Sequence, residues 1–288
     1  MSQPAPDGIL LVDKAVGVTS HDVVDIARRA LGTRRVGHAG TLDPFATGLL
    51  VLLVGRATRL AQFVDGEPKV YDTTIRFGAE TDSDDATGAV TREAGLPDPA
   101  AVRAALPQLT GDLSQVPPSV SAKQVGGVRA HSAARRGAPL DLAPARVTVH
   151  AWDVHAIAAD ELRATIACSG GTYVRALARD LGRAAGSAAH CAALRRIRSG
   201  VFHVRDAVPL GELGDRGADA VRSMLDGLGP IARESLDADG VRRITHGMPV
   251  PATVAGARGA LVDADGTLVA IAERDGDDWR PRVVLRDA

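Results

Sequence analysis

One acidic residue in a turn of unusual composition constrains this chain more than any other feature. The stretch from Arg35 to Leu50 reads RVGHAGTLDPFATGLL and holds a single carboxylate, that of Asp43. The apolar run 49–54 follows directly, so the turn joins two regular elements. A lone carboxylate in such a turn is typical of an active-site loop. The alternative is an Asp that only hydrogen-bonds its own backbone, as Asp often does before Pro.

The composition is that of an ordinary soluble globular protein. The 288 residues are 45% hydrophobic and 24% charged, enough for one large domain or two. No apolar run predicts a membrane span, and residues 1–7 do not resemble a secretory signal. Cys168 and Cys191 are not in a metal-binding or redox pair. We therefore expect reduced thiols, no metal site and a cytoplasmic protein.

Charge is distributed unevenly along a chain whose net charge is −1. Residues 121–205 contain 13 basic and 5 acidic residues, a local net charge of +8. Only three of the 34 basic residues are lysine, and arginine binds phosphate in a bidentate manner and stacks on bases. The pattern favours a polyanion-binding face, although a coding bias toward Arg and Ala gives the same composition.

Local patterns predict alternating strands and helices. We expect strands over 8–12, 69–77, 147–157 and 161–168, helices over about 20–31, 99–109 and 173–185, and a turn and final strand over 194–204. Periodicity cannot decide whether 49–54 is a strand or the start of a helix. Residues 115–145 are rich in Gly and Arg without a sustained period, which predicts a mobile basic insert.

The C-terminal part differs in character from the rest of the chain. We expect a connector over 211–234 with a short helix near 218–225, and then a small β-rich module over 235–288. The dipeptides Asp265-Gly266 and Asp275-Gly276 are hairpin signals within this module.

Four motifs in chain order resemble the TruB family of tRNA pseudouridine synthases. They are GILLVDK at 8–14, the stretch at 35–50, KVY at 69–71, and CSGGTYVRALARDLG at 168–182, continued by AHCAALRR at 189–196. The resemblance covers about residues 8–205. It implies an α+β fold: a catalytic domain over 1–210, with a large mixed, mainly antiparallel sheet flanked by helices, and a small C-terminal β-rich, PUA-like module that binds RNA in many relatives.

The resemblance also implies a reaction. Uridine 55 in the T loop of tRNA would be isomerised by breaking the C1′–N1 bond and rejoining the sugar to C5. No redox change and no net hydrolysis occur, so we expect no cofactor and no metal. The target base must leave the stack to be reached. The expected partner is the T-stem-loop of tRNA, with no membrane and no required protein partner, and we expect a monomer.

The family pattern assigns roles to particular residues. Asp43 is the carboxylate that acts on the sugar or base, and Arg175 holds that carboxylate ionised. Tyr71 stacks on the flipped base and can move a proton. The substrate- and RNA-binding residues by resemblance are His38, near the space that the base vacates, Tyr173 and Leu194 on the uracil pocket, Arg195 and Arg196 toward phosphate, and Lys14.

Each assignment has a simpler alternative. Tyr71 alone is more often a half-buried strand tyrosine, and Arg175 alone a surface arginine with a buried stem. His38 would be a solvated loop residue and Lys14 would cap a turn. Leu194 would be core, and the run 195–198 would be a solvated face. Only their occurrence together with the Asp43 loop favours a site.

The insert departs from the family pattern. The family has Pro-Pro-x-Tyr-Ser-Ala-x-Lys followed by Gly and a later Tyr, whereas this chain reads PPSVSAKQVGG at 117–127. Val120, Gln124 and His131 are the departures, and they concern the RNA contacts of the insert and not the chemistry.

Three other functions compete with a standalone synthase. A catalytic subunit guided by a separate RNA is disfavoured by the compact length and the lack of a long basic tail. A tRNA-binding RNA chaperone without essential catalysis would share the RNA contacts, so only turnover distinguishes it. A glycosidase needs two carboxylates, and the Asp43 loop offers one.

Overall fold

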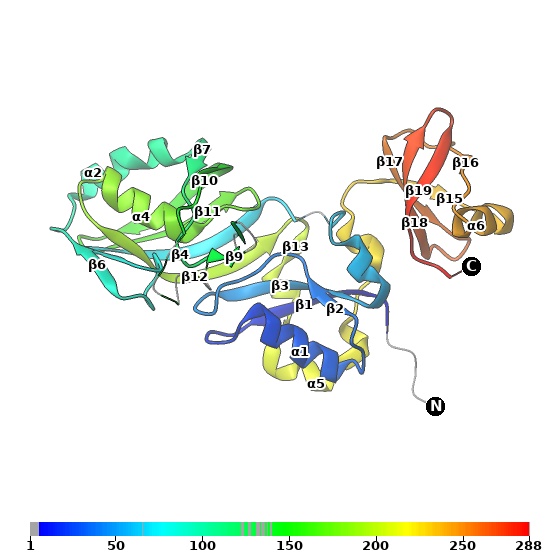
Figure 1. Cartoon of the computed structure of the whole chain (residues 1–288), viewed down its shortest axis with the longest axis horizontal. Helices are drawn as coiled ribbons and strands as arrows, with labels where there is room; N and C mark the ends of the chain where they lie inside the picture. The colour runs from blue at the N-terminus through cyan, green and yellow to red at the C-terminus, as the bar shows by residue number, and fades with distance from the viewer. Residues whose placement is uncertain are drawn as a thin grey trace.

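The structure is a computed structural model that describes residues 6–64, 66–121 and 140–287, with residues 124–125, 128–130, 133, 136 and 138 between them. Part of the predicted insert, including His131, lies outside the described residues. Figure 1 shows two β-sheet units joined by a connector. Within the described residues, no helix has the length and apolar character needed to cross a membrane.

The large sheet is mixed and mainly antiparallel, as predicted. Its order is β14-β1-β3-β12-β4-β11-β10-β7, with β2 paired to β3 and β13 to β12. Within the described residues, β1–β14 and β3–β12 are its parallel pairs. The bounds are β1 Gly8–Lys14, β2 Val36–His38, β3 Thr47–Val54, β4 Lys69–Phe77, β7 Gly111–Gln115, β10 Ala145–Ile157, β11 Glu161–Cys168, β12 Ala189–Ser199, β13 Phe202–His203 and β14 Val208–Pro209.

The apolar run that sequence alone left undecided is strand β3. It pairs along its length with β1, and both strands are buried on both faces. Leu50 and Leu52 pack toward helix α1 (Ser20–Ala30), whereas Leu49 and Val51 join the cluster on the opposite face. Burial on both faces explains why the run is continuously apolar instead of alternating.

Helix α1 begins at a complete capping box. The Thr19 hydroxyl accepts a hydrogen bond from the backbone N–H of Asp22, and the Asp22 carboxylate accepts one from the backbone N–H of Thr19. The arrangement satisfies two N-terminal groups that otherwise lack partners. Thr19 is therefore the N-cap of α1.

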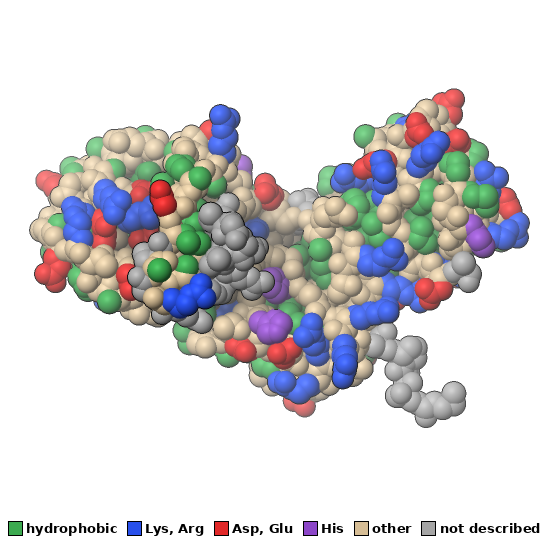
Figure 2. Space-filling view, in the orientation of Figure 1, with side chains coloured by type: hydrophobic (Ala, Val, Ile, Leu, Met, Phe, Trp, Pro, Cys, Tyr) green, Lys and Arg blue, Asp and Glu red, His purple; other side chains and the backbone are tan. Residues whose placement is uncertain are grey.

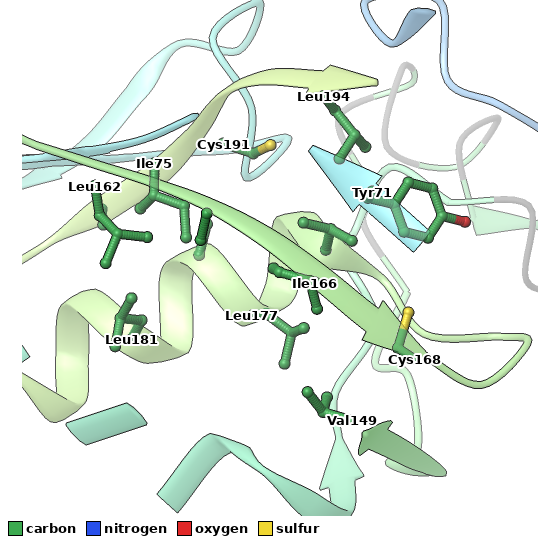
Figure 3. Packing of buried hydrophobic residues seen from close by; sticks show 14 of the residues in the cluster. Tyr71, Ile75, Val149, Leu162, Ile166, Cys168, Leu177, Leu181, Cys191 and Leu194 are labelled. Carbon is green, nitrogen blue, oxygen red and sulfur yellow. The ribbon is translucent and has the colours of Figure 1, made fainter. Parts of the chain in front are cut away.

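The second half of the large sheet packs against helix α4 (Val174–Ala184). Leu177 and Leu181 of this helix lie against Ile75 and Ile166 of the sheet in one cluster, whose packing Figure 3 shows. Tyr71 lies at the end of this cluster, and its hydroxyl points away from the other labelled side chains. The core therefore fixes the ring of Tyr71 and leaves its polar end outside the apolar packing.

The C-terminal unit is a five-stranded sheet in the order β15-β17-β18-β19-β16. Hairpin turns at Gly266 and Gly276, both with positive φ, join its central strands as the sequence predicts. Its core contains fully buried Trp279, whose Nε1 donates a 3.0 Å hydrogen bond to buried Glu234. The elements are β15 Ala232–Ser235, α6 Ala238–Thr245, β16 Val250–Pro251, β17 Arg258–Val262, β18 Leu268–Asp275 and β19 Asp278–Val284.

The two units touch through a short segment after β3. Leu60 belongs to the same cluster as Ala260 and Ile271 of the C-terminal sheet. Arg56 donates a 2.9 Å hydrogen bond to the carbonyl of Leu285. The two units are therefore held together by both apolar packing and a hydrogen bond.

The connector contains three short 3-10 helices, written η, and one four-residue α-helix in place of the single helix expected near 218–225. Its regular parts are η4 Leu210–Glu212, α5 Leu213–Arg216, η5 Gly217–Ala220 and η6 Met224–Gly227. The remaining elements of the larger unit are η1 Gly55–Leu60, β5 Ala79–Thr81, β6 Val90–Glu93, α2 Pro99–Ala105, η2 Leu106–Leu109, β8 Gln124–Val125, β9 Val128–Arg129 and η3 Val204–Asp206.

Candidate active site

A pocket of about 200 Å³ opens where four segments of the larger unit meet. Five of the nine predicted site residues line it. The segments are the loop after β2, the start of β4, the N-terminal end of α4 and strand β12. The lining comprises Thr41, Leu42, Asp43, Lys69, Tyr71, Gly171, Thr172, Tyr173, Val174, Arg175 and Leu194.

Asp43 and Arg175 form a two-point contact on the wall of this pocket. Nη2 of Arg175 donates a 3.0 Å hydrogen bond to Oδ1 of Asp43, and Nε lies 2.9 Å from Oδ2. The Nε hydrogen has no hydrogen-bond partner among the described residues, so the second contact is one of charge alone. The Arg175 side chain is buried, whereas that of Asp43 is 33% exposed.

Arg175 is anchored by more than this one contact. It donates hydrogen bonds of 2.6 Å to the carbonyl of Ser83 and 3.0 Å to the carbonyl of Val120. Its Nη1 also lies 3.4 Å from the buried carboxylate of Asp85. The guanidinium cannot turn away from Asp43 without breaking several of these contacts.

Arg175 favours the charged form of Asp43, but it is not the largest influence on the pKa of this group. The net effect raises the pKa of Asp43 above the ordinary 3.8. Burial is the largest cause of the rise, the charge of Arg175 opposes it, and the nearby carboxylate of Asp85 adds to it. Arg175 therefore offsets only part of the desolvation that the pocket imposes.

The loop before Asp43 is held by hydrogen bonds to its backbone. The hydroxyl of Ser20, at the start of α1, donates to the carbonyl of Leu42 at 3.0 Å and accepts from its N–H at 2.9 Å. Gly40 has a φ of +107°, which L side chains rarely adopt. The glycine in the motif therefore has a conformational role, and the serine fixes the residue next to the carboxylate.

Lys14 does not face RNA, which corrects the prediction for this residue. Its side chain is fully buried, and Nζ donates to the carbonyls of Ala15, Val18 and Pro44 at 3.0, 2.8 and 3.3 Å. Burial lowers the pKa of Lys14 to about 8, although the charge of Asp43 raises it in part. It joins two loops, so the alternative reading of a turn-capping lysine describes it better.

Arg196 is the second correction, because it is fully buried and cannot reach a phosphate. Its Nε donates to the carbonyl of Leu49 at 2.7 Å, and its Nη atoms donate to the carbonyls of Thr41 and Gly40 at 3.3 and 3.1 Å. The guanidinium thus stabilises the Asp43 loop by binding its backbone carbonyls.

Arg195 and His38 lie outside the pocket lining. The Arg195 side chain is 40% exposed and makes contacts of 3.0 and 2.6 Å with the two carboxylate oxygens of Asp13. His38 is half-buried, and its buried Nδ1 has no hydrogen-bond partner among the described residues. Burial, followed by the positive charge of Arg196, lowers the pKa of His38.

Two tyrosines and one leucine form walls of the pocket. Tyr71 and Leu194 are nearly buried, and burial raises the pKa of the Tyr71 hydroxyl. Tyr173 precedes α4, and its backbone is fixed by the side chain of Gln115. The Gln115 amide accepts from the Tyr173 N–H at 2.9 Å and donates to its carbonyl at 3.1 Å.

Sequence reasoning missed several residues that the structure brings to the site. Lys69 lines the pocket, Asp85 contacts Arg175, and Gln115 positions Tyr173. Lys69 is the first residue of the KVY motif, which was the available signal. The carboxylate of Asp85 lies in an acidic segment in which Glu80 and Asp84 are also buried, and the sequence alone does not show this burial.

Much of the positive charge of residues 121–205 is paired with carboxylates within the fold. Besides Arg175, helix α4 carries Arg179, which lies 2.8 Å from Asp84, and Arg183, which lies 2.6 Å from Glu80. On the face in Figure 2, basic and acidic side chains are interspersed on both units. The predicted basic face is therefore weaker than the count of arginines indicates.

Metal ligands and reactive thiols are the other two kinds of group to consider in the part of the chain that the structure describes. No group of three His, Cys, Asp or Glu side chains there could hold a metal ion. Cys168 and Cys191 are free and buried, and burial raises the pKa of their thiols to about 11 and about 12.

Comparison with known proteins decides the family. A model of the TruB family pseudouridylate synthase N-terminal domain matches residues 28–174, and a model of the tRNA pseudouridylate synthase B C-terminal domain matches residues 175–228. The chain belongs to the TruB family. It is thus a tRNA pseudouridine synthase, an isomerase of tRNA modification.

Relatives of this TruB chain match nearly end to end. It is 43% identical to tRNA pseudouridine synthase B of Thermobifida fusca, with 97% of this chain and 98% of the relative covered. It is 41% identical to the enzyme of the same name from Mycobacterium tuberculosis, with 100% and 98% covered.

Solved structures support the fold. A chain of a Cbf5-Nop10-Gar1 complex is 23% identical, with a TM-score of 0.74 and coverage of 97% of this chain and 85% of the other. A chain of an H/ACA RNP bound to a substrate RNA is 20% identical, with a TM-score of 0.73 and coverage of 97% and 85%. The α+β architecture with a C-terminal β module is confirmed.

Proposed function

We propose that this TruB-family enzyme isomerises uridine 55 in the T loop of tRNA, after flipping the base into the pocket beside Asp43. The observation that carries the proposal is the contact of Asp43 with Arg175 on the wall of a small pocket that Tyr71 also lines. At about 200 Å³, the pocket is smaller than the roughly 300–1,000 Å³ of sites for drug-sized ligands. This size suits a single pyrimidine.

Asp43 attacks or stabilises the sugar or the base while the C1′–N1 bond breaks and the C5 bond forms. Arg175 fixes the orientation of the carboxylate and favours its charged form. Because the pKa of Asp43 is raised, the resting carboxylate is less stable than one in water, which suits a group that must react. Tyr71 stacks on the uracil and transfers a proton, in a direction that we leave open.

The remaining contacts hold the flipped nucleotide and the RNA around it. Tyr173 and Leu194 pack against the uracil ring. His38 contacts the RNA near the space that the base vacates, and Arg195 binds phosphate by exchanging its partner Asp13 for the RNA backbone.

Each segment of the chain has its own role in this proposal. Residues 1–210 form the catalytic unit, the insert over 115–145 clamps the RNA, residues 211–234 connect the units, and residues 235–288 add RNA contacts. The enzyme acts as a monomer in the cytoplasm, where its tRNA substrate is found, without a guide RNA.

The deciding experiment is incubation of the protein with unmodified tRNA, followed by mapping of pseudouridine at nucleotide resolution. We expect modification at position 55 by wild type and none by Asp43→Asn, which retains size and can still accept from Arg175. Modification at another position would contradict the T-loop assignment. Equal turnover by Asp43→Asn would contradict the role of Asp43. Binding of tRNA without turnover by wild type would favour the RNA chaperone.

A further inference from the structure

Lys69 is a pocket residue to which neither the family pattern above nor the proposed mechanism gives a role. It is the first residue of β4 and lines the pocket two residues before Tyr71. A Cβ atom added at Gly40 would lie 3.2 Å from its Nζ. The ammonium group of Lys69 therefore lies against the loop that carries Asp43.

The two cations of the pocket differ in their partners. Arg175 is engaged by Asp43, Asp85 and two backbone carbonyls. No carboxylate of the described residues lies within ion-pair distance of Lys69, and its Nζ makes no hydrogen bond to them. Burial, followed by repulsion from Arg196, lowers the pKa of Lys69. Glu67 lies near enough to favour the charged form of Lys69 in part. A half-buried cation with no ion-pair partner among the described residues is held at an energetic cost that a bound anion would remove.

The chemistry of a flipped nucleotide indicates which anion this is. Its uracil is neutral and is matched by the walls of Tyr71 and Leu194, and its sugar must face Asp43. Its phosphodiesters are the anionic groups that remain. An ammonium ion binds phosphate as a point charge without a fixed fork geometry.

We propose that Lys69 binds a phosphodiester flanking the flipped uridine and so fixes the sugar beside Asp43. The inference rests on the proposed function, because it requires a flipped nucleotide in this pocket. It adds a substrate-binding residue whose partner is the RNA backbone, independent of base identity.

The test pairs a change in the enzyme with a change in the RNA. T-stem-loop RNAs carry one uncharged methylphosphonate, either 5′ or 3′ to the target uridine, and wild type is compared with Lys69→Met. For wild type we expect KM to rise roughly tenfold to a hundredfold at one of the two positions. Lys69→Met has a similar KM rise on unmodified RNA and no further rise with that methylphosphonate. Lys69→Arg retains most of the sensitivity.

Arg76→Gln is the matched control, since Arg76 is on the same strand, is exposed and pairs with Glu161 outside the pocket. It should show the full wild-type sensitivity to the methylphosphonate. The slope of log affinity against log salt should fall by about one in Lys69→Met. Wild type that is indifferent to both methylphosphonates, or equal penalties in wild type and Lys69→Met, would overturn the proposal.

Binding by Asp43→Asn separates this inference from the proposed function. Equilibrium dissociation constants are measured for Asp43→Asn with and without Lys69→Met, on RNA with and without the methylphosphonate. They report the coupling between Lys69 and that phosphate without any turnover. Loss of coupling with normal wild-type turnover rejects the role of Lys69 alone. Intact coupling without modification at position 55 rejects the proposed function and supports the phosphate contact.

Discussion

Fully buried Arg196 donates a 3.1 Å hydrogen bond from Nη2 to the carbonyl oxygen of Gly40. Through this bond and its bonds to Thr41 and Leu49, strand β12 supports the loop that carries Asp43. Arg196 does not line the pocket, but it acts on the site through the backbone of this loop and through a side-chain hydrogen bond with Tyr71.

Arg196→Met should destabilise the protein by about 3 kcal/mol, because it leaves buried carbonyls without donors. Arg195→Met is the matched control on the preceding residue of the strand. The contact of Arg195 with Asp13 is partly exposed and should contribute at most about 1 kcal/mol. Urea denaturation measures both changes as the free energy of unfolding. Equal losses in the two variants would contradict the structural role of Arg196.

Gly48→Ala should destabilise the protein by about 3 kcal/mol through strain and overpacking. The φ of Gly48 is +98°, and a Cβ there would lie 2.3 Å from the carbonyl oxygen of Arg196. Gly37→Ala is the control, because the nearest atom to its Cβ, on Thr58, is 3.9 Å away. Thermal unfolding compares the two, and a melting temperature for Gly48→Ala equal to that of Gly37→Ala would show that β3 and β12 can separate at low cost.

The acid limb of kcat/KM should report the raised pKa of Asp43. Activity should fall as pH decreases through a value above 3.8, because protonation removes the reactive carboxylate. Asp85 contributes to the rise, so Asp85→Asn should move this limb to lower pH. Asp82→Asn, at an exposed position of the same loop, should leave it in place. A shift of the limb to higher pH in Asp85→Asn would contradict this account.

The same pKa has a consequence for stability. Ionised Asp43 is disfavoured in the folded chain relative to the unfolded one, so its cost is present above the folded pKa and disappears as pH falls below it. Asp43→Asn should therefore be more stable than wild type at neutral pH and lose this advantage in acid. Urea denaturation at several pH values measures the difference, and an advantage that grows in acid would have the wrong sign.

Glu234→Gln should destabilise the C-terminal unit by about 2 kcal/mol. The carboxylate accepts hydrogen bonds from Trp279 Nε1, from the N–H and hydroxyl of Thr253 and from the N–H of Val254. A Gln amide would place its own N–H groups against some of these donors. Glu273→Gln, in an exposed pair with Arg282, is the control and should cost less than about 1 kcal/mol. Hydrogen exchange should locate the loss in the C-terminal sheet.

Glu234 also gives this unit a pH dependence. Burial raises the pKa of Glu234, but its hydrogen bonds outweigh burial and the net direction is below 4.5. A depressed carboxyl pKa stabilises the folded chain above 4.5, and this contribution is lost as pH falls through the folded value. The stability gap between wild type and Glu234→Gln should therefore close in acid, and a gap that stays constant would contradict the assignment.

Much of the fold could be predicted from local patterns. The alternation over residues 69–77 gave strand β4 with its observed bounds, and the apolar face of α4 predicted the helix that packs on the sheet. The run 49–54 could not be assigned locally, because a strand buried on both faces carries no period of two. Its pairing with β1 decided it.

The site was predicted from motifs, and the two errors of that prediction share one physical origin. Lys14 and Arg196 were expected to contact RNA by resemblance to the family pattern, and charged residues are in general rarely buried. Both are buried here because backbone carbonyls of the loops around Asp43 satisfy their donors. Sequence gives the type of a side chain, whereas its partners depend on loop geometry that only tertiary structure defines.

The bond from Arg175 to the Val120 carbonyl also bears on how the family can diversify. Arg179 makes a similar 2.9 Å bond to the carbonyl of Val116. Every amino acid supplies this oxygen, so valine in place of the family tyrosine at position 120 leaves the tether intact. The side chain at position 120 can therefore change while Arg175 keeps its place beside Asp43.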